Sequence, residues 1–213
     1  MKLNKQDIIN AGIRIIGIKG QSCSGKSEAA TVIKEHFKNA FAFRVDFYMF
    51  NAVVEDDELA RQIYGRGKFT DANEALAYWF GIESVEAIRK NGELTKLYVE
   101  KMLLKDIASL LKQTYVPNPI IIESFALPLY PKICDLITDM LLIWAPKNVL
   151  ERNQINREGN STTAEIRTTA LPLNMYTSGK QGKIILNTGS LEDFKTKVKD
   201  FCNSIPIESN RIF

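Results

Sequence analysis

The segment Gly17–Phe37, GIKGQSCSGKSEAATVIKEHF, contains the pattern that decides the fold. The apolar run Ile13–Gly20 predicts a buried strand, and the apolar residues after Gly25 recur at the spacing of one helix face. Between them, Gly20–Ser27 matches G-x-x-x-x-G-K-[S/T], the pattern of a loop that surrounds phosphates. Because the pattern has the required strand before it and helix after it, the sequence predicts a site for a nucleoside triphosphate.

The residue types in this loop have chemical roles in binding phosphate and Mg²⁺. The two glycines allow backbone angles and a close approach of phosphate that a side chain would block. The backbone N–H groups between them would surround a phosphate at a helix N-terminus, where the helix dipole favours anions. Lys26 would reach the β- and γ-phosphates of ATP, and the Ser27 hydroxyl would bind Mg²⁺. The predicted nucleotide-binding residues are Gly20, Gln21, Ser22, Cys23, Ser24, Gly25, Lys26 and Ser27.

Strand-like and helix-like segments alternate along the chain. Continuous apolar runs such as IIIES and DMLLIWAP are typical of central parallel strands that are buried on both faces. The alternation predicts an α/β fold with a doubly wound, five-stranded parallel sheet flanked by helices. Besides the first strand, the predicted strands are residues 40–46, 120–124, 139–146 and 183–187.

We expect a single P-loop kinase domain over residues 1–213. Its core would comprise about residues 13–50 and 117–205, with a helical acceptor-side segment at about 53–115 and a lid at about 150–180.

The composition restricts the class of protein. With 45% hydrophobic and 25% charged residues, the chain is that of an ordinary globular protein. A net charge of +3 is far from the basic footprint of a nucleic-acid-binding protein, so we expect no nucleic-acid partner. The longest apolar run, MLLIWAP, is much shorter than the roughly 20 residues of a membrane span. Three cysteines without metal-type spacing, and a charged start without a signal peptide, predict a reduced, cytoplasmic setting.

Two acids follow predicted strands at the edge of the sheet where ligands bind. Asp46 ends FRVD, where a carboxylate can accept the proton of an attacking hydroxyl or hold Mg²⁺ through water. Glu123 ends IIIE, in the place of an acid that binds Mg²⁺. The structural alternatives are an N-cap for Asp46 and a contact with a nearby loop for Glu123.

Two later segments, a predicted lid and a loop near the end of the chain, carry further candidate site residues. The segment VLERNQINREGNSTTAEIR is polar, and its Arg152 and Arg157 could close over a polyphosphate and stabilise the transferring phosphoryl group. The alternative is a solvated charged helix. Asn187 and Gly189 lie between a strand and a helix, in a loop that faces adenine or simply leads to a Ser190 N-cap. The candidate catalytic residues are Lys26, Asp46, Arg152 and Arg157.

Four stretches resemble dephospho-coenzyme A kinase, the last enzyme of coenzyme A synthesis. They are the phosphate-binding loop, RVD, PKICDLITDMLLIWAPKNVLERNQINREG and ILNTGSLEDFKTKV. The resemblance implies that the protein uses ATP and Mg²⁺ to phosphorylate the ribose 3′-hydroxyl of dephospho-coenzyme A. It also implies that Asp46 is the base near that hydroxyl, that Arg157 is a lid residue on ATP, and that Asn187 and Gly189 belong to the adenine loop.

The chain departs from this family on the acceptor side of the site. The second acid of the family's D-A-D motif falls on Tyr48, the expected His-Pro pair is absent, and ESFALPLYP replaces P-L-L-F-E. DFY and IIES instead look like uridine kinase, whereas EALAYWFG, ALPLN and NTGSLEDF look like phage-type deoxynucleoside monophosphate kinases. A nucleoside or nucleotide therefore stays an alternative acceptor.

An alternative of another class is a P-loop protein that binds nucleotide without catalysis. The missing acceptor motifs, and Glu28 where the kinase family usually has Thr, favour it. The presence of Asp46, Glu123 and two lid arginines favours an enzyme, because a protein that only binds nucleotide needs no base and lid together.

Overall fold

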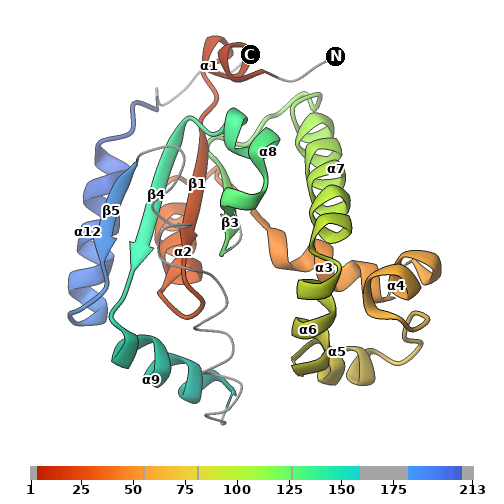
Figure 1. Cartoon of the computed structure of the whole chain (residues 1–213). Coiled ribbons are helices and arrows are strands. Elements are labelled where there is room, and N and C mark those ends of the chain that lie inside the picture. Colours follow the sequence, from red (N-terminus) through yellow and green to blue (C-terminus); the bar gives the residue numbers. More distant parts are fainter. Residues whose placement is uncertain (1–3, 55, 81, 126, 159–181, 208–213) are drawn as a thin grey trace. The chain divides into compact units, whose positions relative to one another are not determined.

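The chain divides into two units, each described here by itself. Unit 1 is formed by Met1–Phe43 with Ile107–Phe213, and unit 2 is formed by Arg44–Asp106 (Figure 1). The computed structural model describes residues 4–54, 56–80, 82–125, 127–158 and 182–207.

Unit 1 is built on a sheet whose strand order is β2–β3–β1–β4–β5. The central strand β1 runs parallel to β3 and β4, and β4 runs parallel to β5. The predicted fold class, a five-stranded parallel sheet flanked by helices, is confirmed. The strands are β1 (Ile15–Gly20), β2 (Phe41–Arg44), β3 (Ile120–Ser124), β4 (Asp139–Trp144) and β5 (Lys183–Leu186).

One face of this sheet is covered by α2 (Lys26–His36) and α12 (Leu191–Asn203), which contact each other (Figure 1). The Ser190 hydroxyl accepts a hydrogen bond from the N–H of Asp193 and so begins α12, as the sequence indicated. Apolar side chains at helical spacing then meet the inward-facing strand residues. The buried cluster includes Ile16, Ile18, Ile33, Ile121, Leu141, Ile143, Ile185, Phe194 and Val198.

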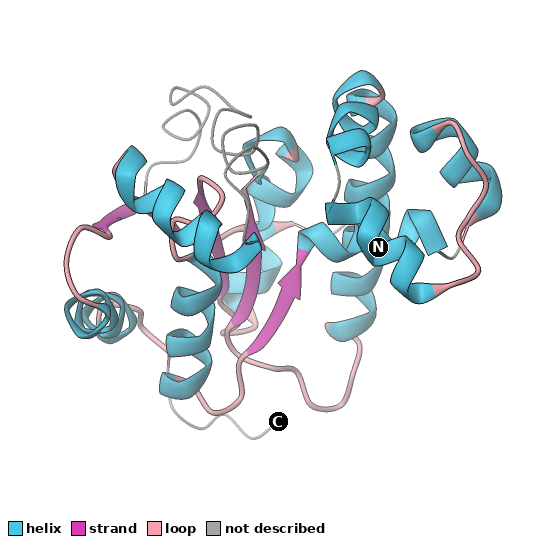
Figure 2. Cartoon of the chain, turned by 90° about the horizontal axis from the view of Figure 1, so that it is seen from below, coloured by secondary structure: helices cyan, strands magenta, loops and turns pink. Residues whose placement is uncertain are grey.

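The other face of β1 packs against the short helix η1 (Leu127–Leu129), which in turn contacts α8 (Pro131–Leu136). Gly17 allows this approach, because a Cβ there would lie 3.1 Å from the Leu127 side chain of η1 and would overlap Ile137. The N-terminal helix α1 (Lys5–Asn10) also contacts α8. Figure 2 shows the strands with helices on both sides of them.

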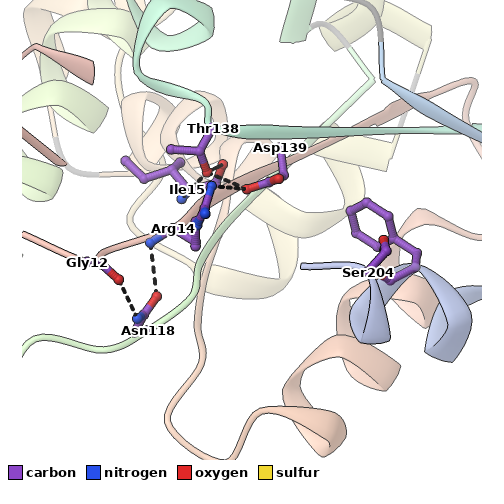
Figure 3. Close-up of polar contacts among 8 residues, drawn as sticks. Gly12, Arg14, Ile15, Asn118, Thr138, Asp139 and Ser204 are labelled. Carbon is purple, nitrogen blue, oxygen red and sulfur yellow. Dashed lines mark hydrogen bonds and ion pairs between the residues drawn. The ribbon is translucent and has the colours of Figure 1, made fainter. Parts of the chain in front are cut away.

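Polar contacts tie the amino ends of the central strands together (Figure 3). The Asn118 side chain accepts from the N–H of Arg14 and donates to the carbonyl of Gly12, both at 2.9 Å. Thr138 Oγ1 accepts from the N–H of Ile15 at 2.9 Å, and the Arg14 guanidinium lies 3.7 Å from the Asp139 carboxylate. These contacts satisfy backbone N–H and C=O groups at the amino ends of the strands. Ligands of open α/β sheets bind at the opposite, carboxyl edge.

Unit 2 is helical. Its aromatic centre holds Tyr64 and Phe69, which are buried, and the ring of Tyr78 lies against both. Arg66 stacks its guanidinium 3.6 Å from the centroid of the Phe69 ring. The helices are α3 (Val45–Val54), α4 (Asp57–Tyr64), α5 (Ala72–Phe80), α6 (Ile82–Lys90) and α7 (Gly92–Leu110), whose last residues belong to unit 1.

The second strand was predicted to run to residue 46 but ends at Arg44, because Val45 already begins α3 and is buried. Helix α6 lies within the segment at about 53–115 that was predicted as helical. Within the described part of the chain, no helix is both long and apolar enough to cross a membrane.

We predict that Tyr64 makes the protein sensitive to alkali. Burial, with 8% of the residue exposed, raises the pKa of the Tyr64 hydroxyl well above its usual value. The unfolded chain ionises this group near pH 10, so its stabilising contribution is complete below pH 10 and is lost as pH rises further. The free energy of unfolding should then fall by up to about 1.4 kcal/mol per pH unit on this account.

The measurement is urea unfolding at pH 8 and at pH 10.5 for wild type and Tyr64→Phe. Between the two pH values, the free energy of unfolding should decline less in the variant than in wild type. Tyr115→Phe is the control, because Tyr115 is 64% exposed and should leave the decline unchanged. Equal declines in wild type and Tyr64→Phe would contradict the prediction.

Candidate functional site

The turn between β1 and α2 has the geometry that the motif predicts. Gly20 and Gly25 adopt positive φ angles of 152° and 107°, which L side chains rarely adopt. A Cβ on Gly20 would overlap the carbonyl oxygen of Ile143, and one on Gly25 would lie 2.8 Å from the Asn187 amide nitrogen. Both glycines are therefore required by backbone angle and by space.

The Lys26 side chain folds back over the loop. Its Nζ donates to the carbonyl oxygen of Gln21 at 2.7 Å, and the N–H of Ser24 donates to the same oxygen at 3.3 Å. Lys26 is only 9% exposed, so its ammonium is held within the loop rather than in bulk water. Cys23 also has a positive φ of 59°, which is uncommon for a residue other than glycine and sharpens the turn.

The two predicted metal ligands lie together. Ser27 Oγ, in the first turn of α2, donates to Glu123 Oε1 at 2.6 Å, although the residues are 96 positions apart. The sheet brings them together, because Glu123 pairs with Ile18 on the neighbouring strand β1. Its carboxylate consequently lies on the face of the sheet that α2 covers.

These residues fit Mg²⁺ and a nucleotide. A hydroxyl and a carboxylate are oxygen ligands of the kind that Mg²⁺ prefers, and Mg²⁺ usually keeps waters and takes substrate phosphates as further ligands. The described residues contain no cluster of three or more His, Cys, Asp or Glu that would hold a metal by themselves. In the same loop, Gln21 Oε1 and Ser24 Oγ are buried without a hydrogen-bond partner, as expected of a loop that receives a polar ligand.

Two asparagine amides hold successive carbonyls of the loop. Asn187 Nδ2 donates to the Ser24 carbonyl at 2.9 Å, and Asn153 Nδ2 donates to the Cys23 carbonyl at 3.0 Å. Because the C=O and N–H of a trans peptide point in opposite directions, fixing a carbonyl also orients the next N–H. Asn153, in α9 (Lys147–Glu158), was not among the predicted residues, and an amide in a charged helix gave no sequence signal for it.

Asp46 is not at the end of a strand, contrary to the sequence prediction. It lies in the first turn of α3, where it is exposed, and it belongs to unit 2. Only Val45 separates it from the end of β2, so the chain itself keeps its Cα within about 7 Å of Arg44. The phosphate-binding loop and Glu123 belong to unit 1.

The remaining predicted residues lie on α9 and after β5. Arg152 and Arg157 both belong to α9, about 140° apart around its axis, and Arg152 is exposed. Residues 159–180 of the predicted lid lie outside the described residues. Gly189 is exposed beside Asp193, whose carboxylate oxygen would lie 2.7 Å from a Cβ at Gly189.

Comparisons with known proteins establish the fold. No protein-family model and no curated protein matches the sequence significantly. The structure resembles TT1252 from Thermus thermophilus, with a TM-score of 0.60 and 21% identity over 90% of this chain and 97% of that chain. It also resembles dephospho-CoA kinase from Campylobacter jejuni, with a TM-score of 0.54 and 15% identity over 90% of this chain and 97% of that chain.

The chain therefore shares its fold with dephospho-CoA kinase from Campylobacter jejuni, in agreement with its phosphate-binding loop and parallel sheet. The particular fold that the sequence resembled, that of dephospho-CoA kinase, is confirmed by the likeness to the Campylobacter jejuni protein. At 15% identity this likeness concerns the fold and leaves the acceptor open.

We predict that Asn153 helps to hold the loop in its binding conformation. A hydrogen bond of this kind contributes about 0.5–1.5 kcal/mol, so Asn153→Ala should weaken binding of a nonhydrolysable ATP analogue by about 3- to 10-fold. Asn153→Asp should weaken it further, because its carboxylate would face the Cys23 carbonyl and a bound phosphate.

Titration calorimetry with Mg²⁺ present measures the effect. Asn203→Ala serves as control, since Asn203 is exposed at the end of α12 and should leave the affinity unchanged. If both Asn153 variants bound the analogue as tightly as wild type, the contact would have no part in nucleotide binding.

Proposed function

We propose that the protein is an ATP-dependent phosphotransferase that acts on a small-molecule acceptor. The observation that carries this proposal is the 2.6 Å contact between Ser27 and Glu123 beside a phosphate-binding loop. A loop that only binds phosphate needs no carboxylate from another strand, whereas a phosphotransferase needs Mg²⁺ fixed beside the phosphates.

In the proposed mechanism, the loop residues position the donor. The N–H groups from Gln21 to Lys26 and the Lys26 ammonium would bind the phosphates, while Ser27 and Glu123 would hold Mg²⁺. A bound Mg²⁺ would supply positive charge beside the transferring phosphoryl group. The rate gain then comes mainly from positioning and from charge stabilisation by groups already in place.

Asp46 is proposed as the base that orients the acceptor hydroxyl, and Arg152 and Arg157 as lid residues. The short chain segment between β2 and Asp46 supports a place for its carboxylate at the sheet edge. The contact of Asn153 with the Cys23 carbonyl anchors α9 at the loop, and Arg152 is the residue just before Asn153. We further propose Asn187 and Gly189 as adenine contacts, and the helical segment at about 53–115 as the acceptor side.

The first candidate acceptor is the ribose 3′-hydroxyl of dephospho-coenzyme A. It is supported by the stretches of sequence that resemble this kinase family in the loop, the lid and the closing segment. The fold shared with dephospho-CoA kinase from Campylobacter jejuni agrees with it.

A nucleoside or deoxynucleoside monophosphate is the second candidate, favoured by the contact that Tyr48 makes. Tyr48 stands where dephospho-coenzyme A kinases carry their second acid. Its hydroxyl donates to the Asp106 carboxylate at 2.7 Å, linking α3 to α7. Burial and this hydrogen bond raise the pKa of Tyr48, so it stays neutral and packs the helical unit instead of acting as an acid on an acceptor.

The test of the proposed function is ADP release from Mg·ATP with dephospho-coenzyme A, uridine, dCMP and dTMP offered separately. We expect turnover with one of them, and a loss of at least about 100-fold in Lys26→Ala, because the variant lacks the charge on the β- and γ-phosphates. Turnover by Lys26→Ala near the wild-type rate would refute the assignment of the loop. ATP binding without turnover of any acceptor would favour the non-catalytic alternative.

We also predict that Glu123 determines the Mg²⁺ concentration at which turnover is half-maximal. Glu123→Gln keeps the shape but removes the charge, so the Mg²⁺ concentration for half-maximal turnover should rise by about 10-fold. Initial rates over a Mg²⁺ series measure this, with Glu192→Gln, at an exposed position on α12, as the matched control. An unchanged Mg²⁺ dependence would remove Glu123 from the metal site.

A further inference from the structure

Lys19 is a charged residue in an otherwise apolar central strand. It precedes Gly20, the first glycine of the phosphate-binding loop, and lies between Leu142 of β4 and Ser124 of β3 in the sheet. Only 4% of Lys19 is exposed. It therefore stands at the carboxyl edge, where open α/β sheets bind their ligands.

The Lys19 side chain lies on the face of the sheet opposite α2. Side chains alternate along a strand, and those of Ile16 and Ile18 belong to the core under α2 and α12. Lys19 thus shares a face with Gly17, whose missing Cβ would meet Leu127 and Ile137. The electrostatic interaction of Lys19 with Cys134 of α8 agrees with this placement.

Ser124 accompanies Lys19 on that face. The two residues are register partners on adjacent parallel strands, so their side chains lie side by side. Ser124 is 1% exposed and follows Glu123 directly. The carboxyl edge consequently carries Lys26, Ser27 and Glu123 on one face, and an ammonium with a hydroxyl on the other.

Burial lowers the pKa of Lys19, against a smaller opposite effect of Cys134. Lys26, the phosphate-binding lysine of the motif, is similarly buried with 9% exposed, so burial at this edge is compatible with binding an anion.

We propose that Lys19 and Ser124 form an anion-binding subsite that takes the phosphate or diphosphate group of the acceptor. This inference rests on the proposed function, because it assigns a charge to the acceptor of that reaction. It favours a phosphorylated acceptor, such as dephospho-coenzyme A or a nucleoside monophosphate, over an uncharged nucleoside.

The experiment is titration calorimetry with inorganic pyrophosphate while the phosphate-binding loop is saturated with a nonhydrolysable ATP analogue and Mg²⁺. We expect wild type to bind pyrophosphate, and Lys19→Met and Ser124→Ala to bind it at least about 10-fold and about 3-fold more weakly. The affinity for the analogue should change less than about twofold. Lys112→Met, at an exposed position in unit 1, is the control for lost positive charge.

A thermal scan shows whether Lys19→Met and Ser124→Ala are folded at the temperature of the titration. If Lys19→Met failed to fold, Ser124→Ala would decide by the same pyrophosphate titration.

The outcomes distinguish the subsite from the proposed function. Equal pyrophosphate binding by wild type, Lys19→Met and Ser124→Ala, or no binding by wild type, would overturn the subsite, whatever the turnover. Turnover with uridine and with none of the phosphorylated acceptors would also overturn the subsite. Weaker pyrophosphate binding by the variants, without turnover of any acceptor by wild type, would support the subsite and contradict the proposed phosphotransferase.

Discussion

The hydrogen bond from the Ser27 hydroxyl to the Glu123 carboxylate joins the start of α2 to the end of β3. For this hydrogen bond to form, the chain must pass from β1 to α2 through a tight turn. Gly20 and Gly25 make this turn possible through positive φ angles that other residues rarely adopt. The parallel pairing of β1 with β3 then brings Glu123 to the same edge, so loop, helix and acid depend on one another.

The loop is also held from outside. The Asn187 and Asn153 amides come from segments far along the sequence, and each fixes one carbonyl of the turn. A glycine-containing loop loses much conformational entropy on ordering, and such contacts reduce what a bound phosphate would otherwise have to order. The residue after β5 and helix α9 therefore take part in shaping the loop.

The carboxyl edge of the sheet has two chemically different faces. The face under α2 carries the motif lysine, a hydroxyl and a carboxylate, which suit a metal-bound polyphosphate. The opposite face carries Lys19 beside Ser124. Alternation of side chains along β1 and β3 separates the two sets, although they are neighbours in sequence.

The sequence by itself determined the central strand, the phosphate-binding loop and the parallel sheet, because a strand, eight-residue motif and helix in direct succession leave few other folds. It placed Asp46 at the end of a strand, since a short apolar run fits a strand or a helix equally well. Only the tertiary structure decided that Ser27 meets Glu123, that Asn153 reaches the loop, and that Lys19 lies beside Ser124. These pairings arise from strand order and register, which link residues far apart in the chain and leave no local pattern in it.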